Sequence, residues 1–311
     1  MPSADSATQQ PNTNTAPTRM GLHNACWTRA ILFFMQWLPA WVFTLLTYPF
    51  AAVAYLLAVN QREALRANLG ALIPGKGSSS LAGYRVFVQF ALTYLDRLWH
   101  LHFGDEIDWQ IIGSQEFGSL QQHTGGALIF TVHSGNYDIG ASLFARKFTR
   151  PVHTVRVPEA SESLQKLRKE ELCAEERREP NLHVHYNEPG GHLGMKLCRL
   201  LMEGEIVCVQ GDRVMGDVAR ARASIDGVTY EIPRGPLVLA EVTGVPCYSV
   251  FLTRRGRLAY TIEICQPFHE GGTKLKADAI AGEWLPVMHQ FLLRHWDQWF
   301  VFEPLVTREA K

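Results

Sequence analysis

The sequence predicts an α/β fold with a mixed, largely parallel central sheet flanked by helices, and with an apolar, membrane-associating helical segment ahead of it. Three observations predict this architecture. Short apolar runs, typical of strands buried on both faces, recur between residues 127 and 264 of the 311-residue chain. Helical stretches separate several of these runs, which indicates strands joined by crossover helices. A long stretch without charged residues precedes them near the N-terminus.

The composition excludes several classes of protein. Lys and Arg together number 30, and Asp and Glu together number 30, so no net charge draws the chain toward nucleic acid. Hydrophobic residues make up 47% and charged residues 19%, which is enough apolar material for a large core. The six cysteines include no C-x-x-C pair, so they lack the spacing of a zinc or thioredoxin-like site. We therefore expect no metal, no cofactor and no nucleic-acid partner.

The N-terminal region divides into a leader and an apolar segment. Residues 1–20 are rich in Ser, Thr, Asn, Gln and Pro and predict a disordered leader. Residues 30–60 contain no Asp, Glu, Lys or Arg, and Pro39 and Pro49 divide them into pieces of about ten residues, shorter than a bilayer core. We expect two helices embedded in or lying on a membrane; a single span and a buried helical pair are the alternatives. The helical region then covers 21–105, and the α/β core covers 106–311.

The remaining elements follow from apolar periodicity and turn residues. A polar helix from about residue 62 ends before the Gly/Ser-rich turn at 74–78. The charged run at 168–179 predicts a solvated amphipathic helix with ion pairs between successive turns. We further expect helices at about 81–102, 138–147, 161–178 and 194–203, and strands at 127–132, 152–157, 206–210, 245–252 and 258–264.

A histidine and an aspartate follow the strand predicted at 127–132. His133 and Asp138 flank a short turn in which the chain passes from strand to helix. A carboxylate that accepts a hydrogen bond from Nδ1–H holds the tautomer whose Nε2 takes a proton, and it stabilises the imidazolium that results. The spacing therefore predicts that His133 is a general base oriented by Asp138. A structural hydrogen bond between the two, or a helix cap, explains the same pattern.

Several segments together resemble one protein family. His133-Ser134-Gly135-Asn136-Tyr137-Asp138 resembles the H-x4-D motif of the lysophospholipid acyltransferase superfamily, and the likeness is closest to the late acyltransferases of lipid A biosynthesis. The similarity covers about residues 25–302. One departure is Asp212-Arg213, where that branch commonly has Asp-Gln, and it leaves the acceptor open. Further similar segments are Asn68-Leu69, Val155-Arg156-Val157-Pro158, the helix-Gly-strand-Asp unit at 200–212, the Gly-x4-Ala stretch with Thr-Gly-x-Pro at 235–246, and Asp297-Gln298-Trp299.

The resemblance implies a membrane-bound enzyme that moves a fatty acyl group from an acyl thioester to a hydroxyl of a lipid or glycolipid. The expected donor is acyl carrier protein, with coenzyme A as the alternative. The expected location is the cytoplasmic face of the bacterial inner membrane. Arginines near predicted strand ends are suited to bind phosphate through paired hydrogen bonds. The candidate substrate-binding residues are Asn136, Arg156, Asp212, Arg213, Arg234 and Gly235.

Two other functions fit parts of the sequence. A thioesterase or other hydrolase would use Ser134 as a nucleophile beside His133, although the chain lacks the G-x-S-x-G elbow there. A lipid-binding homologue without activity would keep the fold but not the chemistry. His183 and His185 have the spacing of neighbouring ligands on a strand, but no third metal ligand stands near them in the sequence.

Overall fold

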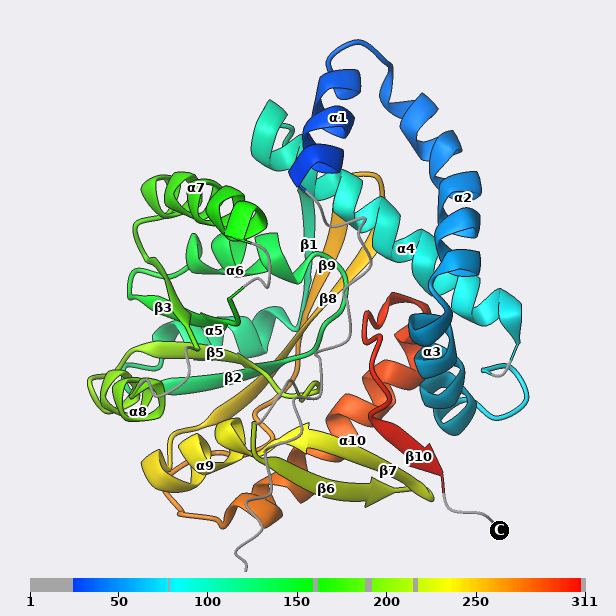
Figure 1. Cartoon of the computed structure of the whole chain (residues 1–311). Helices are drawn as coiled ribbons and strands as arrows, with labels where there is room; N and C mark the ends of the chain where they lie inside the picture. The colour runs from blue at the N-terminus through cyan, green and yellow to red at the C-terminus, as the bar shows by residue number, and fades with distance from the viewer. Residues whose placement is uncertain (1–24, 78, 159–161, 188–191, 215–217, 309–311) are drawn as a thin grey trace, which may run out of the picture.

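The computed structural model describes residues 25–77, 79–158, 162–187, 192–214 and 218–308. A seven-stranded sheet in the order β1-β9-β8-β2-β5-β3-β4 forms its centre, with helices on both sides (Figure 1). A three-stranded antiparallel sheet, β10-β7-β6, lies beside it. The strands are β1 Asp108–Ile112, β2 Ala127–Thr131, β3 Val152–Arg156, β4 Leu182–Tyr186, β5 Ile206–Gln210, β6 Arg220–Ile225, β7 Val228–Pro233, β8 Cys247–Gly256, β9 Ala259–Ile264 and β10 Val306–Arg308.

The central sheet confirms the predicted fold class. Strands β8, β2, β5, β3 and β4 are parallel to one another, and β8 pairs with β9 in the antiparallel sense. The strand predicted from the apolar run at 127–132 is buried on both faces, as a central parallel strand should be. The helices are α1 Ala25–Met35, α2 Ala40–Leu57, α3 Val59–Leu72, α4 Ser80–Leu98, α5 Ser114–Gln122, α6 Tyr137–Ala145, α7 Glu162–Arg178, α8 Leu193–Met202, α9 Arg234–Thr243 and α10 Ala277–His295, with short helical turns at Trp99–Phe103 and Trp296–Gln298.

The N-terminal apolar segment forms two helices, α1 and α2, but their boundary differs in part from the prediction. Pro39 separates them as expected, whereas Pro49 lies inside α2 and does not end it. A proline removes one backbone donor, and packing of α2 on α4 stabilises the helix on both sides of that position. In the described part of the chain, α2 is the one helix long and apolar enough to cross a membrane. The leader predicted at 1–20 lies outside the described residues.

The second sheet was not predicted from the sequence. It forms when β10 near the C-terminus pairs with β7. Asn68 of α3 fixes β10 in place, because its side-chain oxygen accepts hydrogen bonds from the backbone N–H groups of Leu305 and Val306 at 2.9 and 3.1 Å. Its amide donates to the carbonyl of Glu303 at 2.7 Å. The helical N-terminal region and the end of the chain are therefore joined through one buried side chain.

Candidate active site

The site is built at the ends of two neighbouring parallel strands. In the register of β2 and β5, Thr131 is paired with Gln210. His133 and Asp212 each lie two residues beyond that pair, so both side chains leave the sheet at its carboxyl edge. This edge is where open α/β sheets bind their ligands.

The imidazole of His133 and the carboxylate of Asp212 form a close, buried pair. Nδ1 of His133 lies 2.9 Å from Oδ1 of Asp212. Oδ2 of the same carboxylate accepts a hydrogen bond from the backbone N–H of His133 at 2.9 Å and another from the indole of Trp299 at 2.8 Å. The carboxylate is fully buried, whereas 9% of the imidazole is exposed. The imidazole is thus held at Nδ1 and keeps a small exposed area.

The environment keeps the buried carboxylate charged. Burial by itself would raise the pKa of Asp212, but the charge of His133 and the hydrogen bonds from His133 and Trp299 outweigh it. The pKa of Asp212 therefore lies below its ordinary value. A charged acceptor at Nδ1 fixes the tautomer in which Nε2 is free to accept a proton.

The aspartate of the H-x4-D motif has other partners, which corrects the predicted pairing. Nδ1 of His133 forms one hydrogen bond, and its partner is the carboxylate of Asp212. The carboxylate of Asp138 instead lies 3.3 Å from Nε of Arg97 and 3.8 Å from Nη2 of Arg156. Arg97 is buried on α4, so Asp138 ties the first turn of α6 to that helix.

The turn between His133 and α6 is fixed by backbone contacts. Gly135 has a φ of +52°, and a Cβ at this position would lie 2.7 Å from the carbonyl oxygen of Leu252. The hydroxyl of Ser134 donates to that same carbonyl at 2.8 Å. Asn136 is buried, and its amide donates to the carbonyl of Thr93 at 3.3 Å. The turn thus packs against β8 and α4, which sets the direction of the imidazole.

The predicted arginines have different surroundings. The guanidinium of Arg156, 18% exposed, lies 4.0 Å from Glu175 as well as close to Asp138. Arg213 forms an ion pair with Glu303.

Arg234 lies 3.5 Å from Asp278 and is half-exposed. Gly235 follows it in the first turn of α9. Within the described residues, no hydrogen bond or ion pair links Arg234 or Gly235 to His133.

Two residues of the site, Trp299 and Arg97, were not predicted as functional. Trp299, which is fully buried, donates to Asp212, and the backbone N–H of the next residue, Phe300, donates to the carbonyl of His133 at 2.8 Å. The signal for Trp299 was its place in the segment that resembles the family's closing aromatic element. Arg97, which contacts Asp138, gave no such signal, because it directly follows Asp96 in the predicted helix and lies in none of the segments that resemble the family.

The histidines on β3 and β4 form a separate cluster. Nε2 of His185 lies 2.9 Å from Nδ1 of His153, and the rings of His153 and His183 stack with centroids 5.0 Å apart. Burial lowers the pKa of His185 to about 4, so this imidazole stays neutral at physiological pH. Among the described residues there is no group of three His, Cys, Asp or Glu side chains suited to hold a metal ion.

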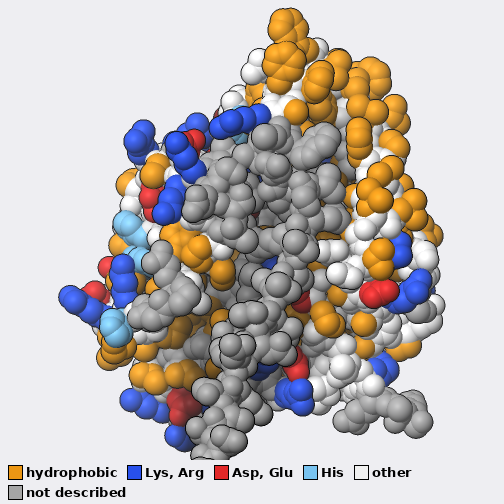
Figure 2. Space-filling view, in the orientation of Figure 1, with side chains coloured by type: hydrophobic (Ala, Val, Ile, Leu, Met, Phe, Trp, Pro, Cys, Tyr) orange, Lys and Arg blue, Asp and Glu red, His pale blue; other side chains and the backbone are white. Residues whose placement is uncertain are grey.

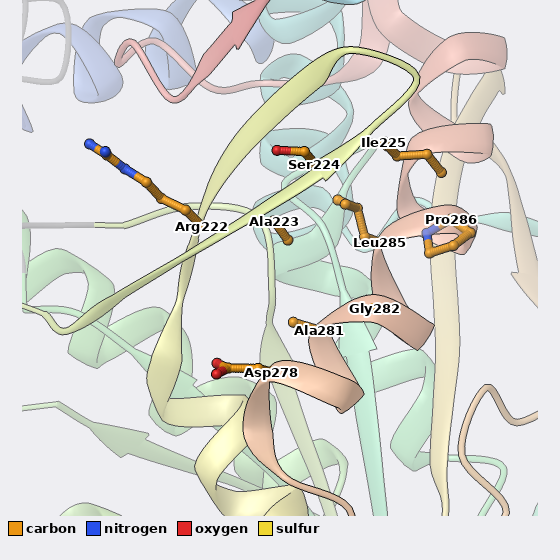
Figure 3. Close-up of a pocket in the computed structure, with 9 residues that line it drawn as sticks. All are labelled: Arg222, Ala223, Ser224, Ile225, Asp278, Ala281, Gly282, Leu285 and Pro286. Atoms are coloured by element: carbon orange, nitrogen blue, oxygen red, sulfur yellow. The ribbon is translucent and has the colours of Figure 1, made fainter.

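A groove of about 360 Å³ lies elsewhere, between β6 and α10 (Figure 3). Ala223 on the strand and Ala281 and Leu285 on the helix line its apolar part. Figure 3 shows Arg222 pointing away from the helix on the strand side. Neither His133 nor Asp212 lines this groove, so it is distinct from the candidate active site.

A mostly parallel α/β sheet with a buried carboxylate–imidazole pair at its carboxyl edge defines a candidate enzyme of the α/β class. The model of the bacterial lipid A biosynthesis acyltransferase family matches residues 19–307, and the chain belongs to this family. The protein is therefore an acyltransferase, which takes an acyl donor and a lipid acceptor. The search of curated proteins gave no match.

Proposed function

We propose that the protein transfers a fatty acyl group from an acyl thioester to a hydroxyl of a lipid or glycolipid, with His133 as general base and Asp212 as the residue that orients it. The observation that carries this proposal is the 2.9 Å contact between Nδ1 of His133 and the buried carboxylate of Asp212. The donor we propose is acyl carrier protein. Asp138 is assigned to hold the first turn of α6 rather than the imidazole.

The chemistry follows from the free nitrogen of the imidazole. Nε2 of His133 takes the proton of the acceptor hydroxyl as its oxygen attacks the thioester carbonyl. The C–O bond forms, the C–S bond breaks, and the imidazolium returns the proton to the departing sulfur. Asp212 stabilises the imidazolium between these two steps. Such a base contributes on the order of 10² to 10⁴ in rate.

The charge that develops on the thioester oxygen requires donors. The first turn of α6 begins at Tyr137, and the initial N–H groups of a helix have no partners within the helix. Arg156 lies at the same edge, beside Asp138. Both features support a binding place for negative charge next to His133.

Exposed apolar side chains support association with a membrane. Trp37, Trp41 and Leu45 are 74%, 67% and 63% exposed. Figure 2 shows hydrophobic side chains gathered at the top and along the right-hand edge, over α1 and α2. The opposite face of α2, with Thr47, Ala51 and Tyr55, is buried in the protein. Because one face of α2 is covered by protein and the other is apolar, we propose that this helix lies in one membrane leaflet and does not span the bilayer.

A hydrolase that uses Ser134 is not supported by the geometry. The Ser134 side chain is fully buried, and its hydroxyl donates to the carbonyl of Leu252 rather than to His133. A serine nucleophile needs its base within hydrogen-bond reach.

Acyl transfer from a purified acyl thioester to a lipid extract, followed by mass spectrometry, tests the proposed reaction. We expect wild-type protein to increase the mass of one lipid class by a single acyl group. His133→Ala should lower the rate at least about 100-fold. It also removes the partner of the buried Asp212 carboxylate, so we expect a loss of about 1–3 kcal/mol in the free energy of unfolding, and the rate is measured at a temperature at which the variant is folded. A variant that retains full activity would contradict the role of His133 as the base.

A further inference from the structure

Some of the acidic side chains of α7 and of the residue after it lie inside the protein, which differs in part from the solvated helix predicted from the sequence. Three glutamates spaced four residues apart are buried, and each faces an arginine of another element. A helix with this spacing directs all three toward one side. The pairs are Glu171 with Arg97 of α4 at 2.7 Å, Glu175 with Arg156 of β3 at 4.0 Å, and Glu179 with Arg146, which follows α6.

The outer face of α7 is left basic. Lys166, Lys169 and Arg177 are exposed, and their spacing of three and eleven residues places them along one side of the helix. Within the described residues, none of the three forms an ion pair with a carboxylate. We call these three residues the basic row. Glu170 is an exposed carboxylate beside the row, so the net charge of this face remains positive.

The basic row begins at the same edge of the sheet as the candidate active site. Strand β3 ends at Arg156, which contacts Asp138, and α7 starts a few residues later at Glu162. Strands β3 and β4 are parallel, so the helix that joins them runs back from the carboxyl edge. Lys166 and Lys169 lie in its first half and therefore near that edge.

The basic row and the apolar surface occupy different parts of the molecule. Figure 2 shows Lys and Arg side chains gathered at the upper left, over α7, whereas the hydrophobic side chains lie at the top and right, over α1 and α2. Helix α7 contacts α1, so the basic row lies beside the apolar surface but on a separate helix. We take a soluble, acidic partner as the occupant because the row starts near the edge of the sheet at which an acyl thioester has to reach His133. Binding of lipid headgroups is the alternative that the vesicle experiment below detects.

We propose that the basic row of α7 is the docking surface for the acidic protein that carries the acyl thioester. The inference rests on the proposed function, because it names the place where the proposed donor binds. Carboxylates on a helix of the carrier would pair with Lys166, Lys169 and Arg177. The carrier's thioester arm would then enter beside Arg156, at the edge where His133 lies. Charge pairing of this kind steers the encounter and depends on salt.

Replacement of all three residues by glutamine tests the proposal, because glutamine has a helix propensity close to that of lysine and arginine. Steady-state transfer is measured with acyl carrier protein as donor and, separately, with acyl-pantetheine, which carries no phosphate. We expect KM for the carrier donor to rise about 10-fold, with kcat changed less than about 2-fold. Kinetics with acyl-pantetheine should not change.

A charge-matched control removes three cations elsewhere: Arg199, Arg222 and Arg255, each an exposed arginine paired with a carboxylate, are replaced by glutamine. This control should leave KM for the carrier within about 2-fold of wild type. An equal rise in KM for both variants would overturn the proposal in favour of a general charge effect. If the glutamine variant of the basic row keeps the wild-type KM but no longer sediments with anionic vesicles, the row binds lipid headgroups and the proposal is overturned.

Failure of the proposed function has a different outcome. Wild-type protein would then transfer acyl groups from neither donor, while binding of the carrier is still measured by surface plasmon resonance. The docking proposal predicts about 10-fold weaker binding for the glutamine variant than for wild type. Equal binding of the two proteins would overturn it regardless of the reaction.

Discussion

Nδ1 of His133 lies 2.9 Å from Oδ1 of Asp212, although the two residues are 79 positions apart in the chain. The contact exists because β2 and β5 are adjacent and in register, which brings the segments after both strands to the same edge. Trp299, from the far end of the chain, completes the set by donating to Asp212. The arrangement of these three side chains therefore results from the folded sheet and not from any local sequence motif.

Replacing Asp212 with asparagine should lower kcat by about 10² to 10⁴-fold with little change in KM. The amide oxygen of asparagine would accept the hydrogen bonds from Trp299 and from the backbone of His133. Its NH₂ group would then donate to Nδ1, which forces the proton onto Nε2 and removes the base. Steady-state kinetics with a fixed acyl thioester measure the effect.

Asp138→Asn is the matched comparison for this prediction. It weakens the contact with Arg97, but Glu171 still pairs with that guanidinium. We expect a loss of about 1–3 kcal/mol in the free energy of unfolding and an effect on kcat at least about 10-fold smaller than that of Asp212→Asn. If Asp138→Asn lowers kcat more than Asp212→Asn does, the assignment of Asp212 as the orienting carboxylate is wrong.

Trp299→Phe should destabilise the protein and lower its rate of acyl transfer. The substitution removes the indole donor to Oδ2 of Asp212 and leaves a charged, buried acceptor with one hydrogen bond fewer. We expect a loss of about 1–3 kcal/mol in the free energy of unfolding by chemical denaturation, together with a decrease in kcat. Trp284→Phe is the control, since that buried indole donates only to the backbone carbonyl of Gly211. Equal decreases in kcat for both variants would show that ring volume, not the hydrogen bond, matters.

The sequence was sufficient for the fold class and for the two strands that hold the site. The apolar runs before His133 and before Asp212 were both predicted as strands, and both residues were named as candidates. Their pairing was missed because Asp138 lies nearer in sequence, whereas contact with Asp212 requires the order of the strands. A crossover longer than two complete helix–strand units separates β2 from β5, and periodicity within single segments does not reveal which strands become neighbours.

Pairing between segments that are far apart in the chain also explains why the second sheet was not predicted from the sequence. The three residues of β10 give too short a pattern to predict a strand, and β10 pairs with β7 only after the chain has passed through α10. The helix predicted at 168–179 is present, but the prediction that its charged side chains are solvated was wrong in part. Glu171 and Glu175 are buried against Arg97 and Arg156, and those partners lie far away in sequence.

Glu175 predicts a dependence of stability on pH. Burial raises the pKa of this carboxyl to about 7, with Arg156 and Arg97 acting in the opposite direction. Between about pH 4.5 and 7 the folded state therefore keeps a proton that the unfolded state releases, so stability falls as the pH rises through this window. Glu175→Gln resembles the protonated form and should raise the free energy of unfolding at pH 8 by up to about 3 kcal/mol.

Thermal unfolding of wild type and Glu175→Gln at pH 5 and pH 8 measures this difference. At pH 5 the two proteins should have nearly equal melting temperatures, and at pH 8 the variant should melt higher. Glu170→Gln, at an exposed position of the same helix, should show no such dependence on pH. A lower melting temperature for Glu175→Gln at pH 8 would mean that the ion pair with Arg156 outweighs the cost of burial.

Serine at the exposed positions Trp37, Trp41 and Leu45 should release the protein from membranes. Burial of each large apolar side chain contributes about 1.5–3 kcal/mol, so the triple variant should bind vesicles at least about 100-fold more weakly. Met195 and Met202 on α8 are similarly exposed, at 65% and 71%, but lie on another helix, so their replacement by serine should leave binding unchanged. Sedimentation with vesicles of bacterial lipids measures the binding of wild type, the triple variant and the Met195/Met202 variant.

The position of α2 in the membrane is tested by extraction. Because one face of α2 is buried against the protein, alkaline carbonate should extract wild type from these vesicles. Resistance to extraction would instead mean that α2 spans the bilayer.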